Sequence, residues 1–377
     1  MTKAAELAKM GEVLSNSQIG RKNIIINGAM QISQRSTSET SLGGSSGIYP
    51  TLDRMKIGVG NTDGRFTMSQ SAVTDLEGFS NALKIDCTTA DTSVATNSFL
   101  IMGTNIEGFD LQQLKATSTT TRAFTLSFYA KSNASRAIVT EINFSNGTNK
   151  SASKLHTIGT SWARYTFTVA SASSTQIDND NSHELSVNFW FNAGSTYTSG
   201  TMSNTLQPIT NANRAVGIGD IFASTDNEIE ITGIQLEVGS QATPFEHRSF
   251  GEELKLCERY FQKHLGTADS NIYTTYAAHR WSNNIAFMSF PLRGIMRAEP
   301  SLAFKDKNGT ALANSSGVGL VSGDGNHDNF TAGNVAFTSG HDGVAVFTIN
   351  LDYNPDNNHA HNAYIDNLTR MDFDAEL

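Results

Sequence analysis

Charge is scarce in this sequence of 377 residues, because Asp, Glu, Lys and Arg together make up only 17% of it. Hydrophobic residues make up 38%, which is enough for packed cores and excludes a chain that is disordered throughout. The 27 basic residues are outnumbered by 36 acidic ones and form no basic cluster, so we expect no nucleic-acid partner. Long apolar runs are also missing, so we expect neither a secretory signal nor membrane insertion.

Cysteine and proline are equally rare, with two and six residues. Cys87 and Cys257 are too few and too far apart for a disulfide scaffold, so we expect two buried thiols and folding in a reducing cytosol. Ser, Thr, Asn and Gly are abundant instead. Ser and Thr are poor helix formers, but they fit a pleated sheet whose other face is buried. The bulk of the chain is therefore predicted to be antiparallel β-structure.

Alternation of apolar and polar residues predicts many strands between residues 59 and 248. Phe124, Leu126 and Phe128 share one face of a strand, and Leu185 and Val187 begin the buried face of another. Strands with polar turns and no intervening helices indicate a β-sandwich of the jelly-roll kind. In the strand over 228–238 the apolar face changes register at residues 232–233, which predicts a β-bulge.

Four segments of the chain lie outside this predicted sandwich. A short helix is predicted within residues 1–20, either as an attachment or trimer-forming helix or as a loosely packed terminal one. Residues 21–58 are expected to form an extended arm. A capping box at Ser249 and Glu252 predicts a linker helix over 249–264. Residues 265–377 are expected to form a second, sandwich-like β-domain, so the fold class is all-β.

Six segments of the sequence, in order along the chain, form a combination that is more specific than its composition. They are IGRKNIIINGAMQISQR at 19–35, YPTLDR at 49–54, ITGIQLEVG at 231–239, the segment 243–261, FPLRGIMRAEP at 290–300 and DFDAEL at 372–377. Together they resemble tail-fibre and virion appendage proteins of marine tailed bacteriophages. One departure is Met55, where the family often has an aromatic residue after the Asp-Arg pair, so we expect no ligand platform at that position.

The resemblance implies several properties of the molecule. It implies a carbohydrate-binding-module-like jelly roll, a C-terminal β tip, and a homotrimer on the virion that attaches to other virion proteins through its N-terminal segment. Synthesis would then take place in the cytoplasm of the host bacterium. Structural calcium in the jelly roll is also implied, with no ligand set that the sequence identifies.

Three functions are compatible with these features. The first is a receptor-binding appendage or tail fibre that adheres to host surface carbohydrate. The second is a purely structural component of the particle, a tail connector or a head fibre or decoration protein. The third is a polysaccharide depolymerase. The sequence has no nucleophile elbow, zinc-protease motif or phosphate loop, and its glutamates fit solvated polar faces, so we expect no enzyme.

Exposed aromatic residues are the first candidates for sugar contacts, because sugar rings stack on flat apolar surfaces. Tyr129 and Trp190 lie opposite well-formed apolar faces, which predicts either exposed platforms or a face covered by another strand, the helix or a sister subunit. A second group precedes the central strand of the C-terminal domain, where it would line a receptor site at the tip or serve packing and trimer contacts: Tyr273, Tyr276, His279 and Trp281.

Two segments carry metal-ligand types. His359 and His361 share one side of an extended chain, as in a site on a trimer axis that holds a transition metal, although exposed loop histidines have the same spacing. Asp324, Asn326 and Asp328 alternate as in a calcium loop, but the glycine and glutamate of such a loop are missing. The sequence therefore predicts no cofactor firmly, and a calcium or axial transition metal only as a hypothesis.

Overall fold

The structure is a computed structural model of the chain. Besides Lys3, it describes residues 21–44, 47–173, 176–265, 274–282, 285–306, 318–321, 327–329, 335–339, 344–350, 361–365 and 369–377. The predicted helix within residues 1–20 lies outside the described residues. The chain divides into two compact units, Met1–Glu253 with Leu377, and Leu254–Glu376. Among the described residues, no helix has the length and apolar character needed to cross a membrane.

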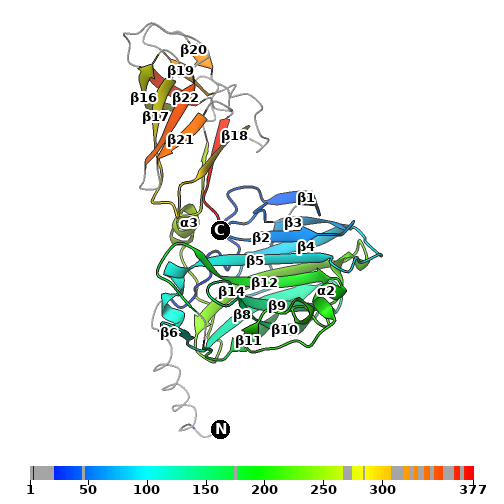
Figure 1. The fold of residues 1–377 in the computed structure, drawn as a ribbon. Coiled ribbons are helices and arrows are strands. Elements are labelled where there is room, and N and C mark those ends of the chain that lie inside the picture. The colour runs from blue at the N-terminus through cyan, green and yellow to red at the C-terminus, as the bar shows by residue number, and fades with distance from the viewer. Residues whose placement is uncertain are drawn as a thin grey trace. The chain divides into compact units, whose positions relative to one another are not determined.

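The first unit consists of two antiparallel sheets of six strands each (Figure 1). Sheet A contains, in spatial order, β1 (Ser38–Leu42), β3 (Arg65–Ala72), β4 (Asn81–Thr89), β14 (Glu228–Val238), β8 (Phe124–Ser132) and β11 (Ala163–Val169). Sheet B contains β13 (Gln207–Pro208), β10 (Lys150–Ile158), β9 (Arg136–Phe144), β12 (His183–Ala193), β5 (Phe99–Glu107) and β2 (Lys56–Gly60). The predicted all-β jelly-roll sandwich is confirmed.

Short elements connect these strands. They are η1 (Gly108–Leu114), the small pair β6 (Lys115–Thr117) and β7 (Thr120–Thr121), α2 (Ser195–Thr198), η2 (Asn211–Asn213) and η3 (Ile221–Ala223).

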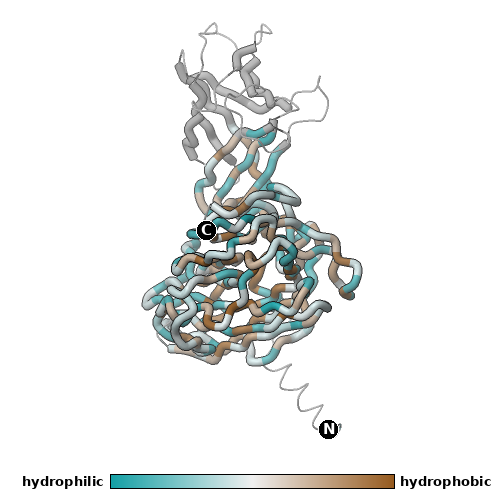
Figure 2. Tube along the Cα trace, turned by 90° about the vertical axis from the view of Figure 1, so that its right-hand side faces the viewer, coloured by the Kyte–Doolittle hydropathy of each residue, from teal (hydrophilic) through white to brown (hydrophobic). Residues whose placement is uncertain are grey.

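The core lies between the two sheets, where the apolar faces predicted from alternation meet. Phe128 of β8 contacts Phe189 of β12 with ring centroids 5.0 Å apart, and Phe124 contacts Phe144 of β9 at 6.2 Å. All four rings are at most 1% exposed. Hydrophobic and hydrophilic parts of the tube are mixed throughout the sandwich in Figure 2. Burying each such ring contributes roughly 1.5–3 kcal/mol, so these cross-sheet pairs hold the layers together.

The predicted bulge in β14 is confirmed, and the segment around Gly28 joins sheet A there. The pairing of β14 with β8 shifts between Thr232 and Gln235, and Gly233 has a φ of +61°. There Ile234 donates its N–H to the carbonyl of Gly28 at 2.9 Å. A Cβ on Gly28 would lie 2.1 Å from the carbonyl oxygen of Ile234, so only glycine allows the two backbones to come this close.

The extended arm predicted over residues 21–58 is wrong. This segment contributes the edge strands β1 and β2 to the two sheets. Its apolar residues Ile25, Met30, Leu52 and Met55 are fully buried in the core of the sandwich. Burying apolar surface contributes about 25 cal/mol of stability per Å². An exposed arm would lose this contribution, so the segment packs into the sandwich.

The second unit holds two further antiparallel sheets. One contains β15 (Phe261–Leu265), β24 (Thr369–Asp374) and β18 (Ser301–Asp306). The other contains β20 (His327–Asn329), β19 (Val318–Val321), β23 (His361–Ile365), β16 (Thr274–Ser282), β17 (Ile285–Pro291), β22 (Val344–Asn350) and β21 (Val335–Ser339). The apolar stretch predicted as a central strand is β17, which pairs on both sides with β16 and β22.

The linker helix is shorter than the predicted 249–264. It is α3 (Phe250–Glu258), and the hydroxyl of Ser249 accepts the N–H of Glu252 at 3.3 Å as the capping box predicts. The helix ends before Phe261, because that residue begins β15 and pairs with Asp374.

A neutral histidine in the sandwich makes its stability depend on pH. His156 is buried, its Nε2 lies 2.9 Å from the hydroxyl of Thr140, and burial followed by the charge of Lys154 lowers its pKa to about 4. The unfolded chain takes up this proton near pH 6.5, and the folded one near pH 4. The stabilisation is complete above pH 6.5 and is lost as the pH falls towards 4, by up to about 3 kcal/mol.

We therefore expect His156→Gln, which keeps a polar group near Thr140 but does not titrate, to flatten this part of the pH dependence. Urea unfolding at a series of pH values measures it for both proteins, and the difference between the two curves isolates His156. Parallel curves between pH 7 and pH 4 would show that folding does not lower the pKa of His156.

Candidate functional site

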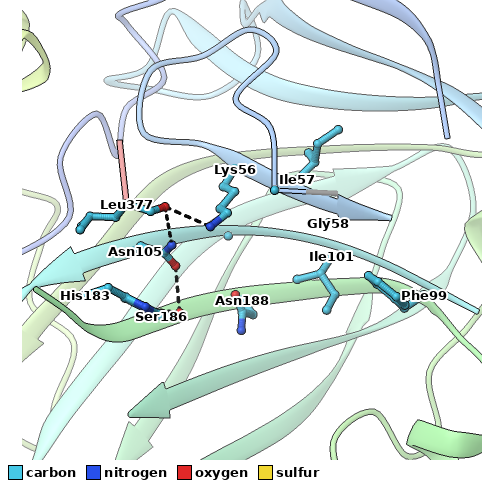
Figure 3. Close-up of a pocket in the computed structure, with 12 residues that line it drawn as sticks. Lys56, Ile57, Gly58, Phe99, Ile101, Asn105, His183, Ser186, Asn188 and Leu377 are labelled. Atoms are coloured by element: carbon cyan, nitrogen blue, oxygen red, sulfur yellow. Dashed lines mark hydrogen bonds between the residues drawn. The ribbon is translucent and has the colours of Figure 1, made fainter. Parts of the chain in front are cut away.

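The outer face of sheet B is hollowed where β2, β5 and β12 lie side by side. This groove has a volume of about 370 Å³ (Figure 3). Small residues create the space, since Gly58 and Gly103 lie on neighbouring strands of its floor. A Cβ on Gly103 would lie 2.4 Å from the side-chain oxygen of Asn188, so a larger residue would push into the groove wall. The residues that line the groove are Gly47, Lys56, Ile57, Gly58, Phe99, Ile101, Gly103, Asn105, His183, Ser186, Asn188 and Leu377.

One end of the groove is a chain of oriented hydrogen-bonding groups. His183 Nε2 lies 2.8 Å from Ser186 Oγ, and that hydroxyl donates to the side-chain oxygen of Asn105 at 2.9 Å. The Asn105 amide nitrogen donates in turn to the main-chain oxygen of Leu377 at 2.9 Å, and Lys56 Nζ lies 3.0 Å from the same oxygen (Figure 3). Each group fixes the orientation of the next, so donors and acceptors stand at set positions.

His183 takes part in this chain as a neutral ring. Burial and then the charge of Lys56 lower its pKa to about 4. A neutral imidazole has one donor and one acceptor nitrogen, so the ring can exchange a hydrogen bond with the Ser186 hydroxyl without bringing a charge into the groove.

The other end of the groove is apolar. Phe99 and Ile101 of β5 are half-buried on the outer face, and the Phe99 ring lies against Gly60, where a Cβ would come within 2.9 Å of it. Tyr197 of α2 meets Phe99 edge-on with ring centroids 6.1 Å apart. The groove thus combines an aromatic wall with a polar floor.

Trp190, for which the sequence left open an exposed sugar platform or a covered face, is fully buried, so the platform is excluded. Residues 194–202 and 211–219, together called the strap below, pack on the outer face of sheet B and enclose Trp190 with Val139 and Ala215 in a second small core. The Trp190 ring lies 5.2 Å from that of Tyr197 and 4.8 Å from the guanidinium of Arg214. The face is thus covered, as in the alternative, but the cover is this strap and not a strand, the linker helix or a sister subunit.

A buried carboxylate holds the strap in place. Glu141 of β9 is 0% exposed and accepts two hydrogen bonds from Arg214, at 2.7 and 2.9 Å. The same carboxylate accepts the Trp190 indole N–H at 3.1 Å and the Asn188 amide at 3.2 Å. Four donors therefore offset the cost of burying one charge. Because Asn188 also lines the groove, this network fixes a groove residue and the strap together.

Removing the charge of Arg214 alone should destabilise the fold far more than removing the charges of Arg214 and Glu141 together. We expect Arg214→Met to cost about 3–5 kcal/mol of unfolding free energy, because Glu141 remains buried with its charge. Combining it with Glu141→Gln should recover much of that loss. A double-mutant cycle by chemical denaturation measures the coupling, and additive losses would show that the two residues act independently.

Tyr129, the other predicted platform of the sandwich, is half-buried on the outer face of sheet A. Its ring lies 5.3 Å from that of Phe79, which also contacts Phe245 at 5.0 Å. The guanidinium of Arg164 lies 5.9 Å from the Tyr129 ring centroid. The segment around Phe245 and His247 thus packs over this half of the sheet, and Tyr129 serves that packing.

The candidates of the C-terminal unit are only partly placed. Tyr276 and Trp281, with His279 between them, belong to β16, and Tyr273 lies outside the described residues. His361 begins β23 and Asp328 belongs to β20, whereas His359, Asp324 and Asn326 lie outside the described residues. The sugar and metal roles proposed for these residues stay predictions.

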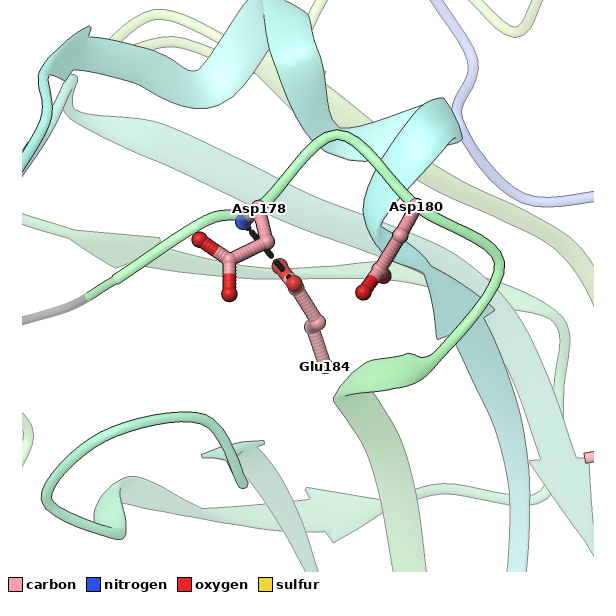
Figure 4. Close-up of side chains that lie close together, drawn as sticks. All are labelled: Asp178, Asp180 and Glu184. Carbon is pink, nitrogen blue, oxygen red and sulfur yellow. Dashed lines mark hydrogen bonds between the residues drawn. The ribbon is translucent and has the colours of Figure 1, made fainter.

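A group of three carboxylates that sequence reasoning missed lies at the start of β12, two on the preceding loop and one on the strand. Ligand atoms of Asp178, Asp180 and Glu184 are within 4.8 Å of one another (Figure 4). Hydrogen bonds from Gln176 and Asn146 lower the pKa of Asp178, whereas burial raises that of Glu184.

This group does not require a cation. The Asp178 N–H donates to Glu184 at 2.8 Å, and the N–H of Ser182 donates to Asp180 at 2.9 Å. All three carboxylates thus already accept hydrogen bonds, and they supply three side chains where calcium takes six to eight oxygen ligands. The calcium that the family resemblance implies is not assigned to this group.

Comparison with known proteins gives distant likenesses only. No protein-family model and no curated protein matches the chain. Solved structures that are similar to part of it include the following three. The enzymatically active domain of tailspike protein 4 from bacteriophage CBA120 is 14% identical with a TM-score of 0.29, and the likeness covers 58% of this chain but only 21% of the tailspike. A family 4 carbohydrate-binding module is 13% identical with a TM-score of 0.29, over 56% of this chain and 98% of the module. A putative sugar-binding protein from Bacteroides thetaiotaomicron is 12% identical with a TM-score of 0.30, over 58% of this chain and all of that protein.

Proposed function

We propose that the sandwich is a glycan-binding module and that its site is the groove on the outer face of sheet B. The observation that carries the proposal is the amphipathic lining of the groove. Phe99 and Ile101 offer an apolar wall at one end, and Asn105, Ser186 and Asn188 offer amide and hydroxyl groups at the other. Sugars have the same division between apolar C–H faces and hydroxyl edges, so each part of the lining has a counterpart in the ligand.

The size of the groove supports a short oligosaccharide. Its 370 Å³ lie near the lower end of the range of small-molecule sites, about 300–1,000 Å³. The oriented chain from His183 to Asn105 supports selectivity, because a hydroxyl at the wrong position would leave a buried polar group unpaired.

Binding without cleavage is the second part of the proposal. The usual hydrolysis of a glycosidic bond needs two carboxyl groups on either side of it. No Asp or Glu is among the described residues that line the groove. Glu141, which contacts the groove residue Asn188, already accepts hydrogen bonds from Arg214 and Trp190. This lining supports an adhesin rather than a depolymerase.

The setting of the module is the third part. We infer that the chain is a tail fibre or other appendage subunit of a tailed bacteriophage, trimeric on the virion, attached by its N-terminal segment and directed at host surface glycans. Support comes from the segments that resemble such proteins, including 231–239 at the β14 bulge. The purely structural alternative is favoured by the packing of Trp190 and Tyr129, since neither is a free platform.

Phe99→Ala tests the groove against this alternative. We expect it to weaken glycan binding by about tenfold or more, because the aromatic wall is lost. Phe109→Ala is the matched control, since Phe109 is 46% exposed and does not line the groove. Ser186→Ala, which removes one hydroxyl, should weaken binding with little change in packing.

The measurement is binding of the full chain and its variants to a glycan array and to host cells, with thermal unfolding to show that each variant is folded. Equal losses in Phe99→Ala and Phe109→Ala would place the site elsewhere. Absence of binding by the unaltered protein to any glycan or host cell would leave the structural role as the better account.

A further inference from the structure

Trp162 stands on the half of sheet A that the Phe245 segment leaves uncovered. It directly precedes β11, and Ala163 at the start of that strand pairs with Ala130 of β8. Because the two strands are antiparallel, Trp162 lies opposite Lys131, the residue after Ala130. Trp162 is only half-buried, in contrast to the fully buried Trp190. A tryptophan that keeps part of its ring in water forgoes burial that the fold could supply.

Two polar groups hold the indole in one orientation. Its Nε1–H donates to the carboxylate of Asp75 at 2.8 Å, and Lys131 Nζ lies 5.0 Å from the ring centroid. Lys131 also pairs with Asp75 at 3.1 Å and lies 3.8 Å from Glu230. A single ammonium group covers one ring face at most, and the side chain of Asp75 is 58% exposed.

The surroundings of Trp162 supply hydrogen-bonding groups and an excess of negative charge. On the neighbouring strands of sheet A, Lys84 of β4 pairs with Glu228 of β14 and lies 4.0 Å from Asp86 of β4. Four carboxylates and two ammonium groups in this network leave a formal charge of minus two. An acidic glycan would be repelled there, whereas the hydroxyls of a neutral sugar find both donors and acceptors.

We propose that Trp162, Asp75 and Lys131 form a second sugar site, for a neutral oligosaccharide, on the face of the sandwich opposite the groove. The free part of the indole stacks on the apolar face of one sugar ring. Asp75 accepts a sugar hydroxyl with its remaining lone pairs, and Lys131 donates to another. The site shares the ligand class of the proposed function but none of the groove residues, so either can be true without the other.

Two sites on opposite faces would let one module engage two glycan chains, or two parts of one chain. The second contact would then be intramolecular, which raises the overall affinity for a polymer above that for a short oligosaccharide.

The test is calorimetric titration of the full chain with hexasaccharides of β-1,4-linked glucose, β-1,3-linked glucose and mannose. We expect Trp162→Ala to lose one binding step or about tenfold in affinity, and Trp162→Phe, which keeps an aromatic face, to lose a few-fold. Phe99→Ala should leave this step in place, and the double variant Phe99→Ala with Trp162→Ala should bind nothing. Thermal unfolding shows that the variants are folded.

The outcomes separate the two sites. Titrations of Trp162→Ala that match the unaltered protein, with all binding lost in Phe99→Ala, would overturn the second site and leave the groove. Loss in Trp162→Ala alone would support the second site, and the glycan array would then decide on the groove. If the unaltered protein binds none of the three neutral sugars, the second site is overturned, and the glycan array decides on the groove.

Discussion

The buried carboxylate of Glu141 is the contact on which the outer face of sheet B depends. Arg214, Trp190 and Asn188 all converge on it, from the strap and from β12. Without this ion the guanidinium would have no buried partner, and the strap would lose its strongest contact with the sheet. With it in place, one half of the face becomes a small core and the other half stays open as the groove. Buried ion pairs rarely add much net stability, so we attribute to this one a role in fixing the position of the strap.

The same division recurs on the opposite face. On sheet A, Thr243 is tied to Glu237 by hydrogen bonds of 2.8 and 2.6 Å, and this contact holds the segment that carries Phe245 over Tyr129. The remaining half carries Trp162 and the ion pair between Lys131 and Asp75. Each sheet thus presents one covered and one open half. The covered halves explain why large aromatic residues occur at outward positions of both sheets, and the open halves are the surfaces left for ligands.

Much of the sandwich could be predicted from the sequence, because strand formation depends on a local period of two. Phe124, Leu126 and Phe128 face the core as their alternation indicates, and the change of apolar face at Gly233 marks a real bulge. The arm could not be predicted in the same way. Residues such as Ile25 and Leu52 are buried by strands far along the chain, and no local pattern identifies those partners.

The site was harder to predict than the fold. Alternation tells which side of a strand a residue takes but not what covers that side, so it left both an exposed and a covered Trp190 possible. The groove draws Lys56, Phe99 and Ser186 from three strands that are distant in sequence. One signal was available: Ser186 and Asn188 alternate with Leu185 and Val187, which marks a polar outward face on β12. It could not show that Gly58 and Gly103 hollow the neighbouring strands.

A crystal structure of the protein with the oligosaccharide that binds it best would test the central claim most directly. The account predicts electron density for a sugar ring against Phe99, with hydroxyls within hydrogen-bond distance of Asn105, Ser186 or Asn188. Sugar density that leaves the groove empty at saturating ligand, with the strap in the position described, would contradict it.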